Sequence, residues 1–108
     1  MKAEAALQDL VTELDRCIDE LAQARQRAGE LLSQRRSGQT WEEIVAQESR
    51  PLVVERLSTV LATLAGAGSA WRREQALALQ AEKVSINRIA AMFGVTRQRI
   101  SALLKEER

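Results

Sequence analysis

The sequence predicts an all-α protein, in which a long N-terminal helix is followed by about five short helices. The 108 residues include one proline and five glycines, so few residues would interrupt a helix. Long stretches are rich in Ala, Leu, Glu, Arg and Gln, which favour helices. No stretch alternates apolar and polar residues with the period of two that a half-buried strand requires.

Charge is distributed unevenly along the chain, although the net charge is only +1. Residues 1–22 carry two basic and six acidic side chains, a net charge of −4, whereas residues 23–36 carry four arginines and one glutamate, a net charge of +3. Residues 69–108 carry eight basic and four acidic side chains, a net charge of +4. Positive charge therefore accompanies the C-terminal segment, where it would attract phosphates.

Composition excludes several classes of site. The chain has one cysteine and no histidine, so an internal disulfide, a histidine metal site and a histidine general base are excluded. No Gly-rich phosphate loop or nucleophile–base pair is present, and we expect no enzyme and no cofactor. The N-terminus lacks the apolar core of a signal peptide, and no stretch is long enough to span a membrane. The predicted location is the cytoplasm, in association with the nucleoid.

Residues 1–36 are predicted to form one helix with a heptad pattern. Such a helix would be about 50 Å long, which is more than the rest of the chain can easily cover. It either dimerises, in a parallel or an antiparallel arrangement, or folds against its own chain. Cys17 is interpreted as a small buried apolar residue. The expected dimerisation residues are Leu7, Leu10, Val11, Leu14, Ile18 and Leu21.

Residues 37–68 are predicted to form a helical core unit. Gly38 ends the first helix, and Thr40 with Glu43 makes a T-x-x-E capping box for a short helix over 41–48. Trp41, at the start of that helix, is expected to anchor the core. Pro51 suits the first turn of the next helix, which should end in the AGAGS sequence of residues 65–69.

Residues 69–108 are predicted to form a tri-helical unit that ends in a helix-turn-helix. Ser69 is the expected N-cap of a helix over 70–82. Gly94 can adopt the positive φ that ends the next helix, and Thr96 can cap the last one. The residues expected to face inward, at helical spacing, are Ile89, Ala90, Phe93, Ile100, Leu103 and Leu104.

The last helix, over residues 96–106, would turn a polar and basic face outward. Arginine suits the O6/N7 edge of guanine and glutamine suits the N6/N7 edge of adenine. We therefore expect this helix in the major groove of double-stranded DNA, with Arg97, Gln98, Ser101 and Ala102 at the bases. The residues expected at phosphates are Ser85, Arg88, Thr96, Arg99 and Lys105. A homodimer would place two such helices about 34 Å apart on an inverted repeat.

Residues 21–64 share part of this pattern. Ile44 matches Ile89 at an offset of 45, and Leu57 matches Ile100 at an offset of 43. The segment is either a degenerate second tri-helical unit or a chance match of short apolar helices. The positions that match Arg97 and Gln98 hold Val54 and Glu55, a pair that would meet phosphates poorly.

The segment FGVTRQRISALLKE resembles the DNA-binding part of sigma-70 region 4, whose motif is close to GVTRERIRQIE. The segment SGQTWEEIVAQES resembles small sigma-like regulators of actinobacteria, with the motif GxSWxEIAxxLGVSRQAV, up to Ala46. The resemblance implies that Arg97, Gln98, Ser101 and Ala102 occupy positions that contact the −35 promoter element, although the family has Arg and Gln at the last two. It implies a sigma-like regulator and not a sigma factor.

Two classes of function stay open. The first is a sequence-specific DNA-binding transcriptional regulator, and phage, plasmid, recombinase-accessory and chromosomal roles are not distinguished. The second is a protein-interaction module, because sigma region 4 folds also bind RNA polymerase subunits and anti-sigma partners. The acidic residues 1–22 could hold a partner helix in that case.

Overall fold

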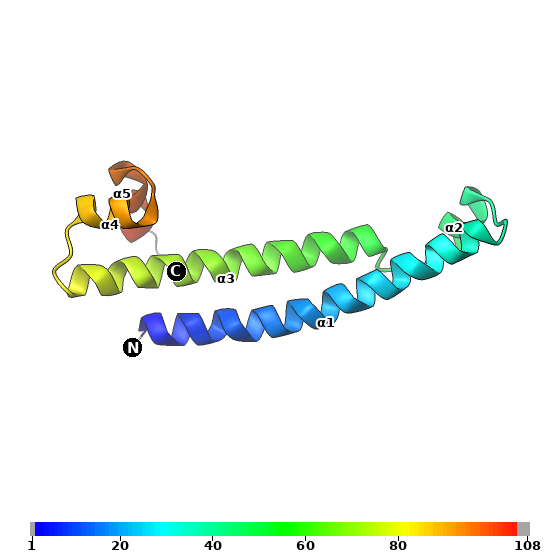
Figure 1. Cartoon of the computed structure of the whole chain (residues 1–108), viewed down its shortest axis with the longest axis horizontal. Coiled ribbons are helices and arrows are strands. Elements are labelled where there is room, and N and C mark those ends of the chain that lie inside the picture. Colours follow the sequence, from blue (N-terminus) through cyan, green and yellow to red (C-terminus); the bar gives the residue numbers. More distant parts are fainter. Residues whose placement is uncertain (1, 106–108) are drawn as a thin grey trace. The chain divides into compact units, whose positions relative to one another are not determined.

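The computed structural model describes residues 2–105, and the regular structure in this range is entirely α-helical (Figure 1). The all-α fold class and the long N-terminal helix are thus confirmed. The prediction of about five short helices after it is wrong, because residues 2–105 contain four further helices, of which one is long. The helices are α1 (Lys2–Arg36), α2 (Trp41–Gln47), α3 (Val53–Ala81), α4 (Ile86–Phe93) and α5 (Arg97–Lys105).

The helix α3 continues through the AGAGS sequence, where we predicted one helix to end and another to begin at Ser69. Two new helix ends would have left backbone carbonyl and N–H groups without intrahelical partners. Gly66 and Gly68 each cost only about 1 kcal/mol relative to alanine inside a helix. The Ala- and Leu-rich flanks and their packing offset that cost, so Ser69 lies inside α3 and is not an N-cap.

The start of α2 agrees with the prediction. α1 ends at Arg36, and Gly38 follows with φ of 104°. Thr40 is the N-cap of α2, where its Oγ1 accepts the backbone N–H of Glu43 at 3.1 Å. In return, Glu43 Oε1 accepts the backbone N–H of Thr40 at 2.9 Å. The capping box is therefore confirmed.

Two predictions in this region are wrong. Trp41 is 59% exposed and therefore does not anchor the core. Its ring lies on the surface, where the Arg35 guanidinium is 5.0 Å from the ring centroid. Pro51 lies before the first turn of α3, which begins at Val53. The backbone N–H of Val53 donates to Glu48 Oε1 at 3.0 Å, so a carboxylate, and not a proline, completes this helix start.

Contacts divide the chain into two compact units, which are described separately. Unit 1 comprises the described residues up to Val11 and those from Gly66 onward, and unit 2 comprises Thr12–Ala65. Both long helices therefore contribute to both units. The three segments predicted from the sequence, 1–36, 37–68 and 69–108, do not coincide with this division.

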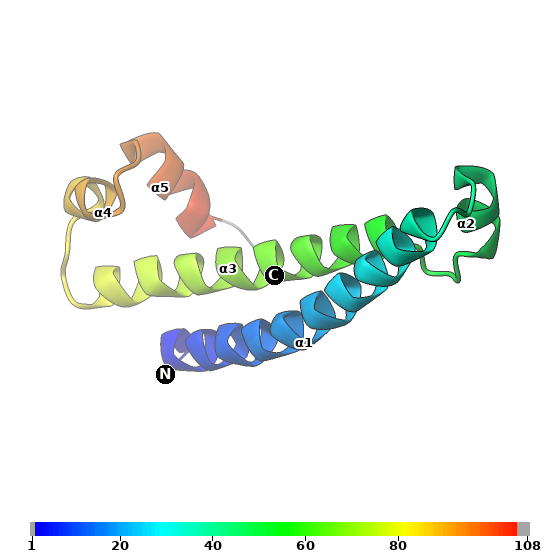
Figure 2. The same cartoon turned by 45° about the vertical axis from the view of Figure 1, so that its right-hand side comes forward.

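Each unit has its own buried residues. In unit 1, α4 and α5 pack together beside the end of α3 (Figure 2). The core of unit 1 consists of Ala76, Ile89, Ala90 and Ile100, with Leu79, Val84, Ile86, Phe93, Leu103 and Leu104 packed against it. In unit 2 the buried residues are Cys17, Ala24, Ile44 and Val60. Cys17 is buried, as predicted.

Candidate nucleic-acid interface

The helix α4 is defined by its two caps. Ser85 is the N-cap, and its Oγ accepts the backbone N–H of Arg88 at 3.2 Å. Gly94 is the C-cap in the left-handed conformation, with φ of 69°. The next N–H, of Val95, bonds the carbonyl of Ala90 at 3.0 Å. This tight end turns the chain directly into α5.

The helix α5 is fixed by a cap and by one fully buried residue. The Oγ1 of Thr96 accepts the backbone N–H of Arg99 at 3.1 Å, so the predicted capping role of Thr96 is confirmed. Ile100 is 1% exposed and packs with Ile89 of α4. Leu103 and Leu104 are half-buried against the same core. The orientation of α5 about its own axis is therefore set.

The opposite face of α5 is polar and open. Arg97, Gln98, Ala102 and Lys105 are exposed, and Ser101 is half-buried. These five residues line one shallow surface depression. The structure thus brings together on one face the four residues predicted to contact bases, with Lys105 beside them. Their role as base contacts stays a prediction.

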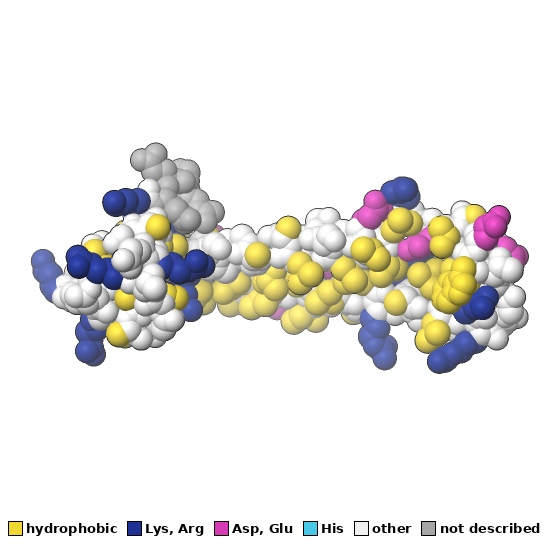
Figure 3. Space-filling view, turned by 90° about the horizontal axis from the view of Figure 1, so that it is seen from above, with side chains coloured by type: hydrophobic (Ala, Val, Ile, Leu, Met, Phe, Trp, Pro, Cys, Tyr) yellow, Lys and Arg dark blue, Asp and Glu magenta, His cyan; other side chains and the backbone are white. Residues whose placement is uncertain are grey.

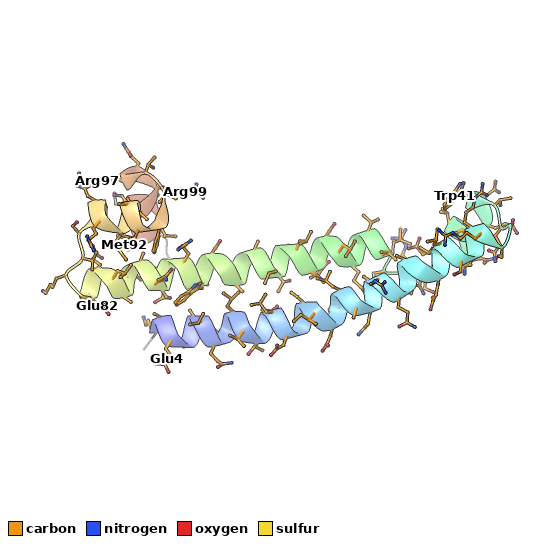
Figure 4. All side chains as sticks on the ribbon, viewed as in Figure 1. Glu4, Trp41, Glu82, Met92, Arg97 and Arg99 are labelled. Atoms are coloured by element: carbon orange, nitrogen blue, oxygen red, sulfur yellow. The ribbon has the colours of Figure 1, made fainter. Side chains whose placement is uncertain are left out.

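The residues predicted at phosphates are divided between α4 and α5. Ser85 and Arg88 belong to the start of α4, where the Ser85 hydroxyl still has a hydrogen to donate after capping. Arg97 and Arg99 extend from different sides of α5 (Figure 4). Thr96 and Lys105 lie at the two ends of α5. Three of the five residues predicted at phosphates, Thr96, Arg99 and Lys105, therefore lie on or next to α5.

A further cation beside α5 was missed from the sequence. Arg72 of α3 lies over the Phe93 ring, 4.2 Å from its centroid. It lines a second depression together with Arg99, Ala102 and Leu103 of α5. Among the described residues, no acidic side chain lines either depression. Only the folded packing of α3 on α5 brings Arg72 here, so no local sequence signal could have found it.

The predicted dimerisation residues lie on α1. Leu7, Val11, Leu14, Ile18 and Leu21 are all exposed, and Ile18 is 64% exposed. Leu10 differs, because it is half-buried and belongs to the same heptad row as the buried Cys17 and Ala24. Five of the six predicted residues therefore form an apolar row that the described part of the chain leaves open.

No group of acidic, cysteine or histidine side chains among the described residues could hold a metal ion. None of the helices in residues 2–105 combines the length and the apolar character needed to cross a membrane.

Comparisons of the chain with models of protein families, with curated proteins and with solved structures found no match. The resemblance to sigma region 4 therefore stays a prediction from the motifs.

Proposed function

We propose that the protein is a sequence-specific, double-stranded DNA-binding transcriptional regulator that places α5 in the major groove. The observation that carries this proposal is the polar face of α5, where Arg97, Gln98, Ser101, Ala102 and Lys105 line one depression. An arginine and a glutamine in the first turn of a helix are suited to base edges. The cations around them, including Arg72 and Arg99, are suited to phosphates.

The proposed assembly on DNA is a homodimer on an inverted repeat. One helix of this size contacts few base pairs, and two copies multiply the specificity. The exposed apolar row on α1 supports a dimer, because a soluble chain seldom leaves such a row open. The proposal includes a cytoplasmic, nucleoid-associated location and resemblance to the sigma-like regulators.

The test begins with selection of bound duplexes from a random pool, followed by anisotropy titrations on the selected site. Arg97→Ala should weaken binding to that site by about 1–3 kcal/mol, because one base contact is lost. The matched control is Arg50→Ala, which removes the same charge from an exposed arginine of unit 2. Affinity should also fall steeply between low and moderate salt, because counterions are released. An unchanged affinity of Arg97→Ala would reject α5 as the DNA-binding element, and a salt-independent affinity would reject binding through phosphate contacts.

A second candidate function is binding of RNA polymerase or of a sigma or anti-sigma partner. The observation that favours it is the exposure of Trp41 and Val45 on α2, since exposed aromatic side chains are common in protein interfaces. A pulldown with Trp41→Ala distinguishes the two functions. Loss of a captured polymerase subunit, with Arg97→Ala still binding that subunit, would favour this alternative.

A further inference from the structure

The helix α1 carries two neighbouring apolar rows with different surroundings. The first row includes Cys17 and Ala24, which are buried within their own chain. The second row is the exposed one, with spacings of four and three residues that alternate as at the a and d positions of a heptad. Its exposed apolar members are Leu7, Val11, Leu14, Ile18, Leu21 and Leu32, and its remaining positions are Arg25 and Ala28.

In unit 2, α3 widens this exposed face. Arg56 bonds Gln23 at 3.2 Å and pairs with Glu20 at 3.6 Å, which fixes one flank of the α1–α3 contact. Residues one position further along each helix lie about 100° around it and face the other flank. Leu21 of α1 and Leu57 of α3 occupy these positions, and Leu14, Ile18, Leu61 and Leu64 share the same side of their helices at helical spacing. Leu57 and Leu64 are half-buried, and the other four are exposed.

Hydrophobic side chains accordingly form a band on the exposed face of the helices in Figure 3. A face of this kind, two helices wide, is typical of half of a four-helix bundle.

We propose that a second copy of this chain covers this face, with the two α1 helices antiparallel and Ile18 of each copy opposite Leu21 of the other. This arrangement specifies the homodimer of the proposed function. Its link to DNA binding rests on that proposed function. In this register Leu7 lies opposite Leu32, Val11 opposite Ala28, and Leu14 opposite Arg25.

Charge decides the orientation. In a parallel, in-register dimer equivalent a positions face each other, so Arg25 would meet Arg25 and Glu4 would meet Glu4. In the antiparallel arrangement Arg25 lies opposite Leu14 and beside Asp15 of the second copy. Arg36 likewise lies beside Glu4 of the second copy. All four side chains are exposed in the single chain, and each contact occurs twice by symmetry.

Charge also decides the register. Antiparallel helices can pair a with d positions in several registers, each displaced by one heptad step. One step in either direction places Arg25 beside Gln8 or beside Ala22 of the second copy. Neither residue offers a carboxylate, and the contact between Arg36 and Glu4 is lost as well. Only the proposed register pairs both arginines with acidic side chains.

Spin labels on the protein without DNA test the arrangement. Asp19→Cys and Ser33→Cys are made separately in a Cys17→Ala chain, so that each copy carries one label. Both sites are exposed and occupy the same heptad position. In the proposed dimer the labels at 19 lie at nearly the same level, whereas those at 33 are separated by about 40 Å along the bundle.

Equal short distances at both sites would show a parallel dimer and overturn the proposal, as would a monomeric mass without dipolar coupling. A longer distance at 19 would overturn the register. Because DNA is absent, failure here is distinct from failure of the proposed function. An antiparallel dimer without DNA affinity would reject only that function.

A charge reversal provides a second test of the register. Arg25→Glu should raise the dissociation constant of the dimer by about tenfold or more, because it faces Asp15 of the second copy. Adding Asp15→Arg should restore association, as measured by analytical ultracentrifugation. Circular dichroism of both variants checks the fold. A dimer that is insensitive to Arg25→Glu, or one that Asp15→Arg does not restore, would overturn the register.

Discussion

The α4–α5 region of unit 1 and the α2–α3 region of unit 2 are built alike up to the turn. In each, a hydroxyl residue caps a short helix, and an isoleucine four residues beyond the cap is buried. The turns differ. Gly94 reverses the chain at once with a positive φ, whereas Glu48 ends α2 with an extended backbone and four residues separate it from α3.

The second helices differ in their first turns. α5 begins with Arg97 and Gln98, both exposed. α3 carries Val54, which is 72% exposed, and Glu55, whose carboxylate accepts the Leu52 N–H and an Arg50 guanidinium N–H, each at 2.8 Å. The two helix pairs therefore share a plan but present different side chains, an exposed arginine and glutamine in one and an exposed valine and a bonded carboxylate in the other. The proposed function depends on which side chains the turn leaves free.

The largest effect on DNA affinity is expected when Arg97 and Gln98 are replaced by the residue types at the matching positions of unit 2, valine and glutamate. A variant with Arg97→Val and Gln98→Glu should lose most specific DNA affinity, about 1–3 kcal/mol for each base contact. The new carboxylate would also face phosphates. The measurement is fluorescence anisotropy on the selected site, with circular dichroism to check the fold, since both positions are exposed. Retained affinity would place the DNA contact outside α5 and remove the distinction between the two regions.

An intermediate effect is expected at the turn itself. Gly94→Ala should lower the free energy of unfolding by about 1–2 kcal/mol, because an alanine is strained at positive φ. Nothing lies within 4 Å of an added Cβ there, so only the backbone is strained. The control is Gly66→Ala, which also meets open space but lies inside α3. It should raise stability by up to about 1 kcal/mol in the same urea titration. Equal signs for the two variants would contradict the assigned role of Gly94.

The smallest effect concerns the cap of α2 and should not involve α4 or α5. Hydrogen bonds from the Thr40 backbone N–H and hydroxyl lower the pKa of Glu43 below its ordinary value of 4.5. A lowered folded-state pKa stabilises the protein above the ordinary value, and this contribution is lost as pH falls through the folded pKa. Thermal unfolding between pH 6 and about 3 should show this loss, and Glu43→Gln should reduce it. An identical pH profile for both proteins would exclude the carboxylate as the cause.

Much of the candidate site follows from local rules of the sequence. Gly94, Thr96 and Ile100 could be placed because a positive φ, a cap and a helical period each depend on a few adjacent residues. The capping box at Thr40 was predictable for the same reason. The predicted helix break at residues 65–69 was wrong. Whether two glycines end a helix depends on how well the whole helix packs, which the local sequence does not show.

Features that depend on distant residues could not be predicted. Trp41 has the large apolar side chain of a typical core residue. The packing of α1 and α2 nevertheless leaves its ring on the surface, next to the Arg35 guanidinium. Arg72 acquires its place beside Arg99 only when α3 and α5 are packed. The division into units also depends on distant residues, because the start of α1 and the second half of α3 belong to one unit, where Ala3 and Leu77 line the same depression.

That division has a consequence for the order of folding. Unit 2 is one continuous stretch, Thr12–Ala65, so all of its contacts form within that stretch. Unit 1 is discontinuous, because the start of α1 must meet residues beyond Gly66. Bringing distant segments together costs entropy that rises with the intervening length, but a formed unit 2 would shorten that search. We therefore expect the chain to fold from its middle outward, with the ends of the two long helices meeting last.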